Sequence, residues 1–236
     1  DEKAQTAAQA FERYDLVSAP VVDKDHRLVG RVTVNAVVDY IRESTETEQL
    51  SRAGLREGED IFASVWDSVK NRWSWLAVNM VTAFIASRVI GAFEGSIEKL
   101  VALAALMPIV AGIGGNSGNQ TITMIVRALA LGQVQQESAR VLLRKEIGVA
   151  MVNGLIWGSL LGFVAWWLYR SVALGAVMTA AMMLNLIVAA TVGVAVPLLR
   201  QRLGYDPAIG SSVLITAVTD SGGFFIFLGL ATVFLL

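Results

Sequence analysis

Long apolar runs fill the chain after residue 72, and a charged segment of mixed pattern precedes them. Five runs approach the ~20 residues that a helix needs to cross a bilayer, and they cover roughly 73–93, 100–127, 147–169, 172–199 and 210–236. Charge follows the same division, since residues 1–72 carry 14 acidic and 10 basic side chains and residues 73–236 carry only 6 and 9. The pattern predicts a mainly α fold, with a five-helix transmembrane pore domain at 73–236 behind a charged head.

The head has the pattern of a small α/β segment. Two short β-type runs, Ser18–Val22 and Leu28–Thr33, flank the polar turn DKDH, and helical spacing precedes and follows them within residues 1–50. Residues 51–72 read as a polar linker and an amphipathic connecting helix. The sequence begins without Met and without the basic start and apolar run of a signal peptide. We therefore expect it to be a piece of a longer protein.

Basic residues in the short loops predict the orientation of the chain in the membrane. The loops after the second and fourth runs hold Arg127, Arg140, Arg144, Lys145, Arg200 and Arg202. Lys and Arg are enriched in cytoplasmic loops. We expect a multi-pass protein of the plasma membrane, the inner membrane in a bacterium, with its N-terminus cytoplasmic and its C-terminus extracytoplasmic.

The chain lacks the residues on which several classes of enzyme depend. The chain has no cysteine and one histidine, His26, so it offers no thiolate metal site, no cysteine nucleophile and no histidine cluster. A nucleotide-hydrolysing P-loop of the form GxxxxGK[ST] is also absent. We do not expect an enzyme, and nothing in the sequence indicates a nucleic-acid partner.

Asp220 is the only acidic residue deep within a predicted span. An Asp at the centre of a membrane helix costs ~2.5–3.5 kcal/mol on an insertion scale. The side chain is therefore expected to face a polar cavity or a cation. The alternative is a structural Asp that is hydrogen-bonded to neighbouring Ser or Thr residues.

The stretch AGIGGNSGNQT, residues 111–121, interrupts the second run with small and polar residues. With Pro108 before it, its glycines are expected to break the helix, so that freed carbonyls line a water-filled path. Close helix packing through small residues is the alternative, and both can hold together. Further oxygens come from Asn116, Asn119, Thr121 and Thr123.

These oxygens favour a hard cation such as Mg²⁺ or Ca²⁺. One carboxylate per chain is too few to strip Mg²⁺ of its water. We therefore expect a hydrated ion, held at a dimer axis where two chains each supply Asp220.

The segment MPIVAGIGGNSGNQTITMIVRALALG resembles the signature of the MgtE-type magnesium channels. RKEIGVAMVNGLIWG, RLGYDPA and LITAVTDSGGFFIF resemble later segments of that family in the same order, so the resemblance covers essentially the whole chain. It implies a homodimer in the lipid bilayer, five transmembrane helices per subunit, a pore between the subunits and cytosolic domains that sense Mg²⁺.

Residues 1–50 resemble the second half of a CBS-type regulatory domain. In the GxxTxxD pattern by which many such modules bind adenine nucleotides, Gly30 and Thr33 are present but Ala36 replaces the acid. This departure disfavours nucleotide binding by this segment.

The resemblance also implies roles for single residues. Asp220 matches the central pore carboxylate, and Glu94 and Glu98 match acidic residues at the outer mouth. The matching pore-lining positions are Gly112, Gly115, Asn119, Thr123 and Thr216, together with Ser212, which stands where the family pattern has Asn.

Carboxylates near the cytoplasmic side are expected to bind a regulatory Mg²⁺ that closes the pore, unless they are an ordinary solvated acidic face. These candidates are Asp206, Glu59 and Asp60, with Glu57 and Asp67 beside them. The implied function is a Mg²⁺-selective channel for magnesium uptake, gated by cytosolic Mg²⁺. A Na⁺- or H⁺-coupled secondary transporter and a non-transporting membrane sensor remain as alternatives, and the oxygens alone leave Ca²⁺ and Co²⁺ open.

Overall fold

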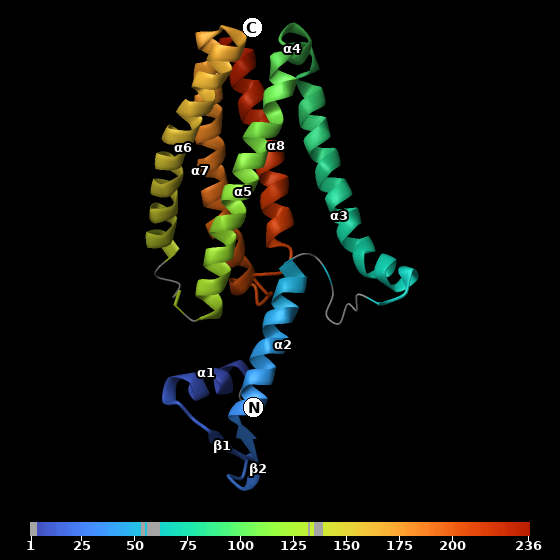
Figure 1. Cartoon of the computed structure of the whole chain (residues 1–236), viewed down its shortest axis with the longest axis vertical. Coiled ribbons are helices and arrows are strands. Elements are labelled where there is room, and N and C mark those ends of the chain that lie inside the picture. Colours follow the sequence, from blue (N-terminus) through green and yellow to red (C-terminus); the bar gives the residue numbers. More distant parts are fainter. Residues whose placement is uncertain (1–3, 53–54, 56–61, 132, 135–138) are drawn as a thin grey trace. The chain divides into compact units, whose positions relative to one another are not determined.

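The computed structural model describes residues 4–52, 55, 62–131, 133–134 and 139–236. The chain divides into two units, Asp1–Phe62 and Ala63–Leu236. Each unit is described separately below, and the elements of both are labelled in Figure 1.

The first unit is a β-hairpin with a helix on each side in sequence. Its elements are α1 (Ala4–Tyr14), β1 (Ser18–Val22), β2 (Leu28–Thr33) and α2 (Val34–Arg52). The two strands pair antiparallel and have the bounds predicted from the sequence. Asp23 fixes the turn between them, because its Oδ1 accepts hydrogen bonds from the backbone N–H groups of Asp25 and Arg27, both at 2.9 Å. A small core of Ala8, Phe11 and Val37 holds the helices on the hairpin.

The second unit consists of helices joined by short connections in its described part. Its elements are α3 (Val65–Ala92), α4 (Glu94–Lys99), α5 (Ala102–Ala130), α6 (Ala139–Tyr169), α7 (Val172–Arg202) and α8 (Ser211–Phe234). The predicted connecting helix and first span form one helix, α3, which is capped by the Ser64 hydroxyl accepting from the Asp67 N–H at 3.2 Å. The short α4 occupies a segment that the sequence pattern left as a loop.

Three helices, α5, α7 and α8, contact one another pairwise and form the centre of this unit. Helix α6 packs on α7, and α3 packs on α8 (Figure 1). The main core lies among the three central helices, where Leu103, Met178 and Phe227 are fully buried. Membrane helices have no hydrophobic drive to associate with one another within lipid, so close packing must hold these contacts.

Close packing between α6 and α7 depends on glycines spaced four residues apart. Gly154, Gly158 and Gly162 are buried and face α7. A Cβ at Gly158 would lie 3.1 Å from the Thr179 carbonyl oxygen. The Thr179 hydroxyl lies 3.0 Å from the Gly158 carbonyl, to which it donates a hydrogen bond across the interface. This is the small-residue packing that lets two backbones approach.

The expected break in the second run is wrong, because α5 continues without interruption from Ala102 to Ala130. Pro108 lies inside the helix, and residues 111–121 are helical throughout. The glycines contact neighbouring side chains instead: Gly114 lies against Asn185 of α7, and Gly118 lies against Ile215 of α8. The packing interpretation of this stretch is therefore confirmed, and the interpretation of freed carbonyls is not.

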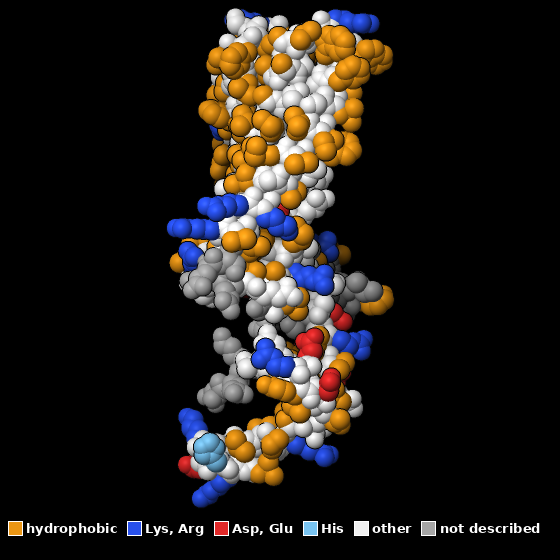
Figure 2. Space-filling view, turned by 90° about the vertical axis from the view of Figure 1, so that its left-hand side faces the viewer, with side chains coloured by type: hydrophobic (Ala, Val, Ile, Leu, Met, Phe, Trp, Pro, Cys, Tyr) orange, Lys and Arg blue, Asp and Glu red, His pale blue; other side chains and the backbone are white. Residues whose placement is uncertain are grey.

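Within the described ranges, four helices, α3, α6, α7 and α8, are long and apolar enough to cross a membrane. The face of the helical unit that carries α6 is covered by apolar side chains, with Lys and Arg mostly at its ends (Figure 2). Helix α5 has 29 residues, or ~43 Å at 1.5 Å per residue, so it is also long enough. Its polar stretch makes its membrane-length segment less apolar than those of the other four helices, so its membrane crossing stays a prediction.

Candidate cation site

Three polar side chains line one face of α8 at intervals of four residues. Ser212 and Asp220 are half-buried, and Thr216 between them is exposed. Residues four apart lie above one another on a helix. The Thr216 hydroxyl donates to the Ser212 carbonyl at 3.0 Å, so its oxygen keeps lone pairs for another ligand.

Asp220 is the carboxylate of this face. It is the tenth residue of α8, ~14 Å from the start of the helix, which places it near the middle of the span. Within the described part of the chain it forms no hydrogen bond and no ion pair. The structural alternative, in which Ser or Thr neighbours hold the carboxylate, is therefore wrong for these residues. A group with four lone-pair sites is left open to a ligand.

One hydrogen-bonded link joins this face of α8 to α5. The Ser212 hydroxyl donates to Oδ1 of Asn119 at 2.7 Å, and Nδ2 of Asn119 donates to the Gly115 carbonyl at 3.0 Å. Gly115 is buried, and a Cβ there would lie 3.5 Å from the hydroxyl of Thr219. Three of the predicted pore residues thus meet at one point between α5 and α8.

The remaining predicted residues of α5 lie on its open side. Gly112 and Thr123 are exposed, and Asn116 is exposed with them. A Cβ at Gly112 would meet nothing within 4 Å. The four-residue spacing of Gly112 and Asn116, and the position of Thr123 seven residues beyond Asn116, put all three near one face of α5. This face and the α8 face therefore both leave polar atoms uncovered.

Thr121 does not belong to that face, although the sequence grouped it there. It is buried, and its hydroxyl donates to Oε2 of Glu146 on α6 at 3.1 Å. Glu146 is only 4% exposed, and its Oε1 lies 3.4 Å from Nζ of Lys145. Sequence reasoning missed this buried carboxylate because it adjoins Arg144 and Lys145 at the start of an apolar run and so resembles a loop residue.

Asn185 of α7 is a second polar residue that the sequence did not single out. It is fully buried, and its Nδ2 donates to the Val110 carbonyl of α5 at 2.9 Å. Its Oδ1 has no hydrogen-bond partner in the described part of the chain. An unsatisfied buried acceptor costs about 1–3 kcal/mol. Asn185 could have been noticed as the single Asn in the fourth apolar run.

The predicted outer-mouth residues lie far along the bundle from these groups. Glu94 and Glu98 are exposed on α4, and Ser96 between them shares a 2.7 Å hydrogen bond with Thr232 near the end of α8. The structure therefore places the two glutamates at the end of the bundle where α8 finishes. The basic residues of the α6 start and the α7 end lie at the opposite end.

Only some of the predicted regulatory carboxylates belong to the described part of the chain. Asp206 is exposed between α7 and α8, where its Oδ1 accepts from the Ala208 N–H at 2.8 Å and its carbonyl accepts from Nε of Arg200 at 2.9 Å. Glu59 and Asp60 lie outside the described residues, as does Glu57. Among the described residues, no three acidic or histidine side chains form a group that could hold a metal ion.

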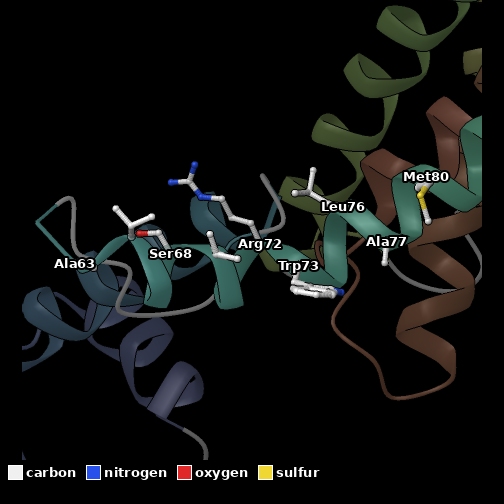
Figure 3. Close-up of a pocket in the computed structure, with 9 residues that line it drawn as sticks. Ala63, Ser68, Arg72, Trp73, Leu76, Ala77 and Met80 are labelled. Atoms are coloured by element: carbon white, nitrogen blue, oxygen red, sulfur yellow. The ribbon is translucent and has the colours of Figure 1, made fainter.

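A hollow of about 610 Å³ lies along α3, well away from Asp220 in the sequence. Nine residues from Ala63 to Met80 line it, and Figure 3 shows Trp73, Leu76 and Met80 along the same helix. Its lining contains Arg72 and no acidic side chain. A cation site needs oxygen ligands, so the candidate site stays at the polar faces of α5 and α8.

Several apolar helices of membrane-spanning length define a multi-pass membrane protein, and one of them carries a half-buried carboxylate with no partner among the described residues. The family model described as MgtE, divalent cation transporter, matches residues 107–230, which is more than half of the chain. This chain belongs to the MgtE family.

Two curated relatives match along nearly the whole chain. The protein named magnesium transporter MgtE of Thermus thermophilus is 34% identical over 100% of this chain and 52% of its own length. The protein of the same name from Bacillus subtilis is 31% identical over 98% of this chain and 51% of its own length. The chain thus spans about half the length of the curated relatives it matches.

Proposed function

We propose that this chain forms the path by which Mg²⁺ crosses the membrane, and that Asp220 binds the ion. The observation that carries the proposal is the carboxylate itself, which is half-buried near the middle of α8 and has no protein partner among the described residues. Its cost of ~2.5–3.5 kcal/mol in a membrane helix is offset when a cation occupies the site. The relatives named magnesium transporters support Mg²⁺ as the cation.

The ion is proposed to keep much of its water shell. Ser212 and Thr216 offer hydroxyls on the Asp220 face, and Asn119 adds an amide oxygen that already accepts from Ser212. These neutral oxygens can contact coordinated water, whereas one carboxylate is too little charge to replace it. A homodimer with the α5 and α8 faces toward its axis would bring two copies of Asp220 to one ion.

The continuity of α5 supports a channel over a coupled secondary transporter. Transporters of that kind commonly bind their ions at helices that are interrupted at mid-membrane, and α5 is uninterrupted. A divalent cation gains ~4.6 kcal/mol from a membrane potential of 100 mV, at ~2.3 kcal/mol per charge, so inward flow needs no second ion.

The proposed orientation places the basic ends of α5, α6 and α7 in the cytoplasm. Glu94 and Glu98 then lie on the outer side, where they can raise the local concentration of cations. Asp206 lies on the inner side, between α7 and α8, and is proposed to bind a regulatory Mg²⁺. Binding of the ion there would hold the inner ends of α7 and α8 together when Mg²⁺ is abundant.

The test is Mg²⁺ uptake into liposomes that contain the purified chain. With Na⁺ and H⁺ gradients abolished and a negative internal potential imposed, we expect uptake to continue. Competition by Ca²⁺, Co²⁺ and Mn²⁺ in the same assay measures selectivity. Uptake that stops without a Na⁺ or H⁺ gradient would establish the coupled transporter instead. Equal rates in liposomes with and without protein would contradict the proposal altogether.

A further inference from the structure

Asn185 connects the two helices that carry the candidate cation site, although it belongs to neither. It lies on α7 and is fully buried. Its Nδ2 donates to the Val110 carbonyl of α5 at 2.9 Å, one turn before Gly114. On the other side it lies against Gly223 of α8, three residues after Asp220.

Two glycines make room for this one side chain. A Cβ at Gly114 would collide with Nδ2 of Asn185, and a Cβ at Gly223 would lie 2.7 Å from the same atom. For both glycines the three nearest atoms all belong to Asn185. The amide is therefore held between the backbones of α5 and α8. It limits how closely the two helices approach and fixes the register of α8 along α5.

The contact lies at the level of the proposed ion path. Gly114 is adjacent to Gly115, whose carbonyl accepts from Asn119, and Asn119 accepts from Ser212. Gly223 is less than one turn from Asp220. Any shift of α8 against α5 at Asn185 would move Asp220 relative to the oxygens of α5.

We propose that Asn185 is a positioning residue for the cation path, which keeps Asp220 of α8 in register with the polar face of α5. The inference rests on the proposed function, because it assigns a role within that path. A leucine of similar size would fill the same space and leave no unsatisfied oxygen, so an apolar core does not require the amide. The hydrogen bond to the Val110 carbonyl is what leucine cannot supply.

The first measurement compares Asn185→Leu with Asn153→Leu. Asn153 is half-buried on α6 and forms no hydrogen bond in the described part of the chain, so it controls for loss of an amide from the membrane domain. Loss of a hydrogen bond that sets the register is expected to lower Mg²⁺ flux about fivefold to tenfold in Asn185→Leu. We expect Asn153→Leu to keep the flux of the parent chain.

The second measurement reads the register without transport. The chain has no cysteine, so Asn119→Cys with Ser212→Cys gives the only possible disulfide within one chain, which is measured as the cross-linked monomer. A second pair, Asn119→Cys with Thr216→Cys, samples one turn further along α8. With Asn185 present, the first pair is expected to cross-link much faster. Asn185→Leu, and Asn185→Ala as the variant that adds no bulk, should lower the ratio of the two rates about fivefold to tenfold.

Only folded protein from size-exclusion chromatography enters both measurements. An unchanged cross-linking ratio in folded Asn185→Leu and Asn185→Ala would overturn the inference, whatever the flux. A changed ratio with unchanged flux would also overturn it, because the register would then not matter for the ion. Absence of flux in the parent chain would defeat the proposed function alone, since the cross-linking ratio would still report on Asn185.

Discussion

Gly118 provides the sharpest test of how the polar stretch of α5 works. A Cβ at this position would collide with Cγ1 of Ile215 and lie 2.8 Å from its Cδ1, and it would lie 3.6 Å from Cβ of Ala189. Ile215 is fully buried on α8, so its side chain has little room to move away. We therefore expect Gly118→Ala to push α5 and α8 apart.

Two opposing effects determine the size of the change. Overpacking a buried position costs about 1–3 kcal/mol, and alanine is better than glycine in a helix by about 1 kcal/mol. Because the overlap involves Cγ1 as well as the chain end Cδ1, a rotation of the chain end cannot relieve it and the upper half of the first range applies. The expected net loss in the free energy of unfolding is about 1–2 kcal/mol, which corresponds to a fall in Tm of roughly 2–8 °C for a domain of this size.

The assay is thermal unfolding in detergent, followed by size-exclusion chromatography, with Gly148→Ala as the control. A Cβ at Gly148 of α6 would meet nothing within 4 Å, so this variant should keep or slightly raise the Tm. Ile215→Ala alone is expected to cost about 2–5 kcal/mol. The double variant Gly118→Ala/Ile215→Ala should lose less than the sum of the single losses, by about 1–2 kcal/mol, because the added methyl fills part of the cavity. Additive losses, or a Gly118→Ala variant as stable as Gly148→Ala, would refute the packing reasoning.

Two further predictions concern the buried polar contacts. Thr121→Val removes the donor to Glu146. A hydrogen bond to a buried charged group contributes about 1.5–3 kcal/mol, so the Tm of this variant should fall. An unchanged Tm would show that Lys145 alone satisfies this carboxylate. Gly223→Ala should lower the yield of folded protein because its methyl overlaps Asn185, and adding Asn185→Ala should restore that yield. A double variant that folds no better than Gly223→Ala would contradict the contact between Gly223 and Asn185.

The helices were largely predictable because each long apolar run became one helix. The strands β1 and β2 have the predicted bounds, since the β-type runs and the polar turn between them are local signals. The continuity of α5 could not be predicted from residues 111–121. Glycine costs helix stability, and the compensating contacts come from Asn185 and Ile215, which are distant in the sequence.

The candidate site was predictable only where its signal is local in the sequence. Asp220 is visible in the sequence because a charge within an apolar run is costly wherever the helix packs. The link from Ser212 to Asn119 depends on how α8 lies against α5, and the pattern of one run carries no information about that. Glu146 was hidden because its basic neighbours resemble a loop, whereas its burial depends on Thr121 of another helix.

The central claim, that the unpaired carboxylate of Asp220 binds the ion, is tested most directly by Asp220→Asn in the liposome assay. Asparagine keeps the shape and removes the charge, and Ser221→Ala on the adjacent position of α8 is the control. We expect Asp220→Asn to keep its Tm and to lower Mg²⁺ flux at least about tenfold, a loss of ~1.4 kcal/mol or more, with Ser221→Ala unchanged. A folded Asp220→Asn protein that carries Mg²⁺ at the parent rate would contradict the account.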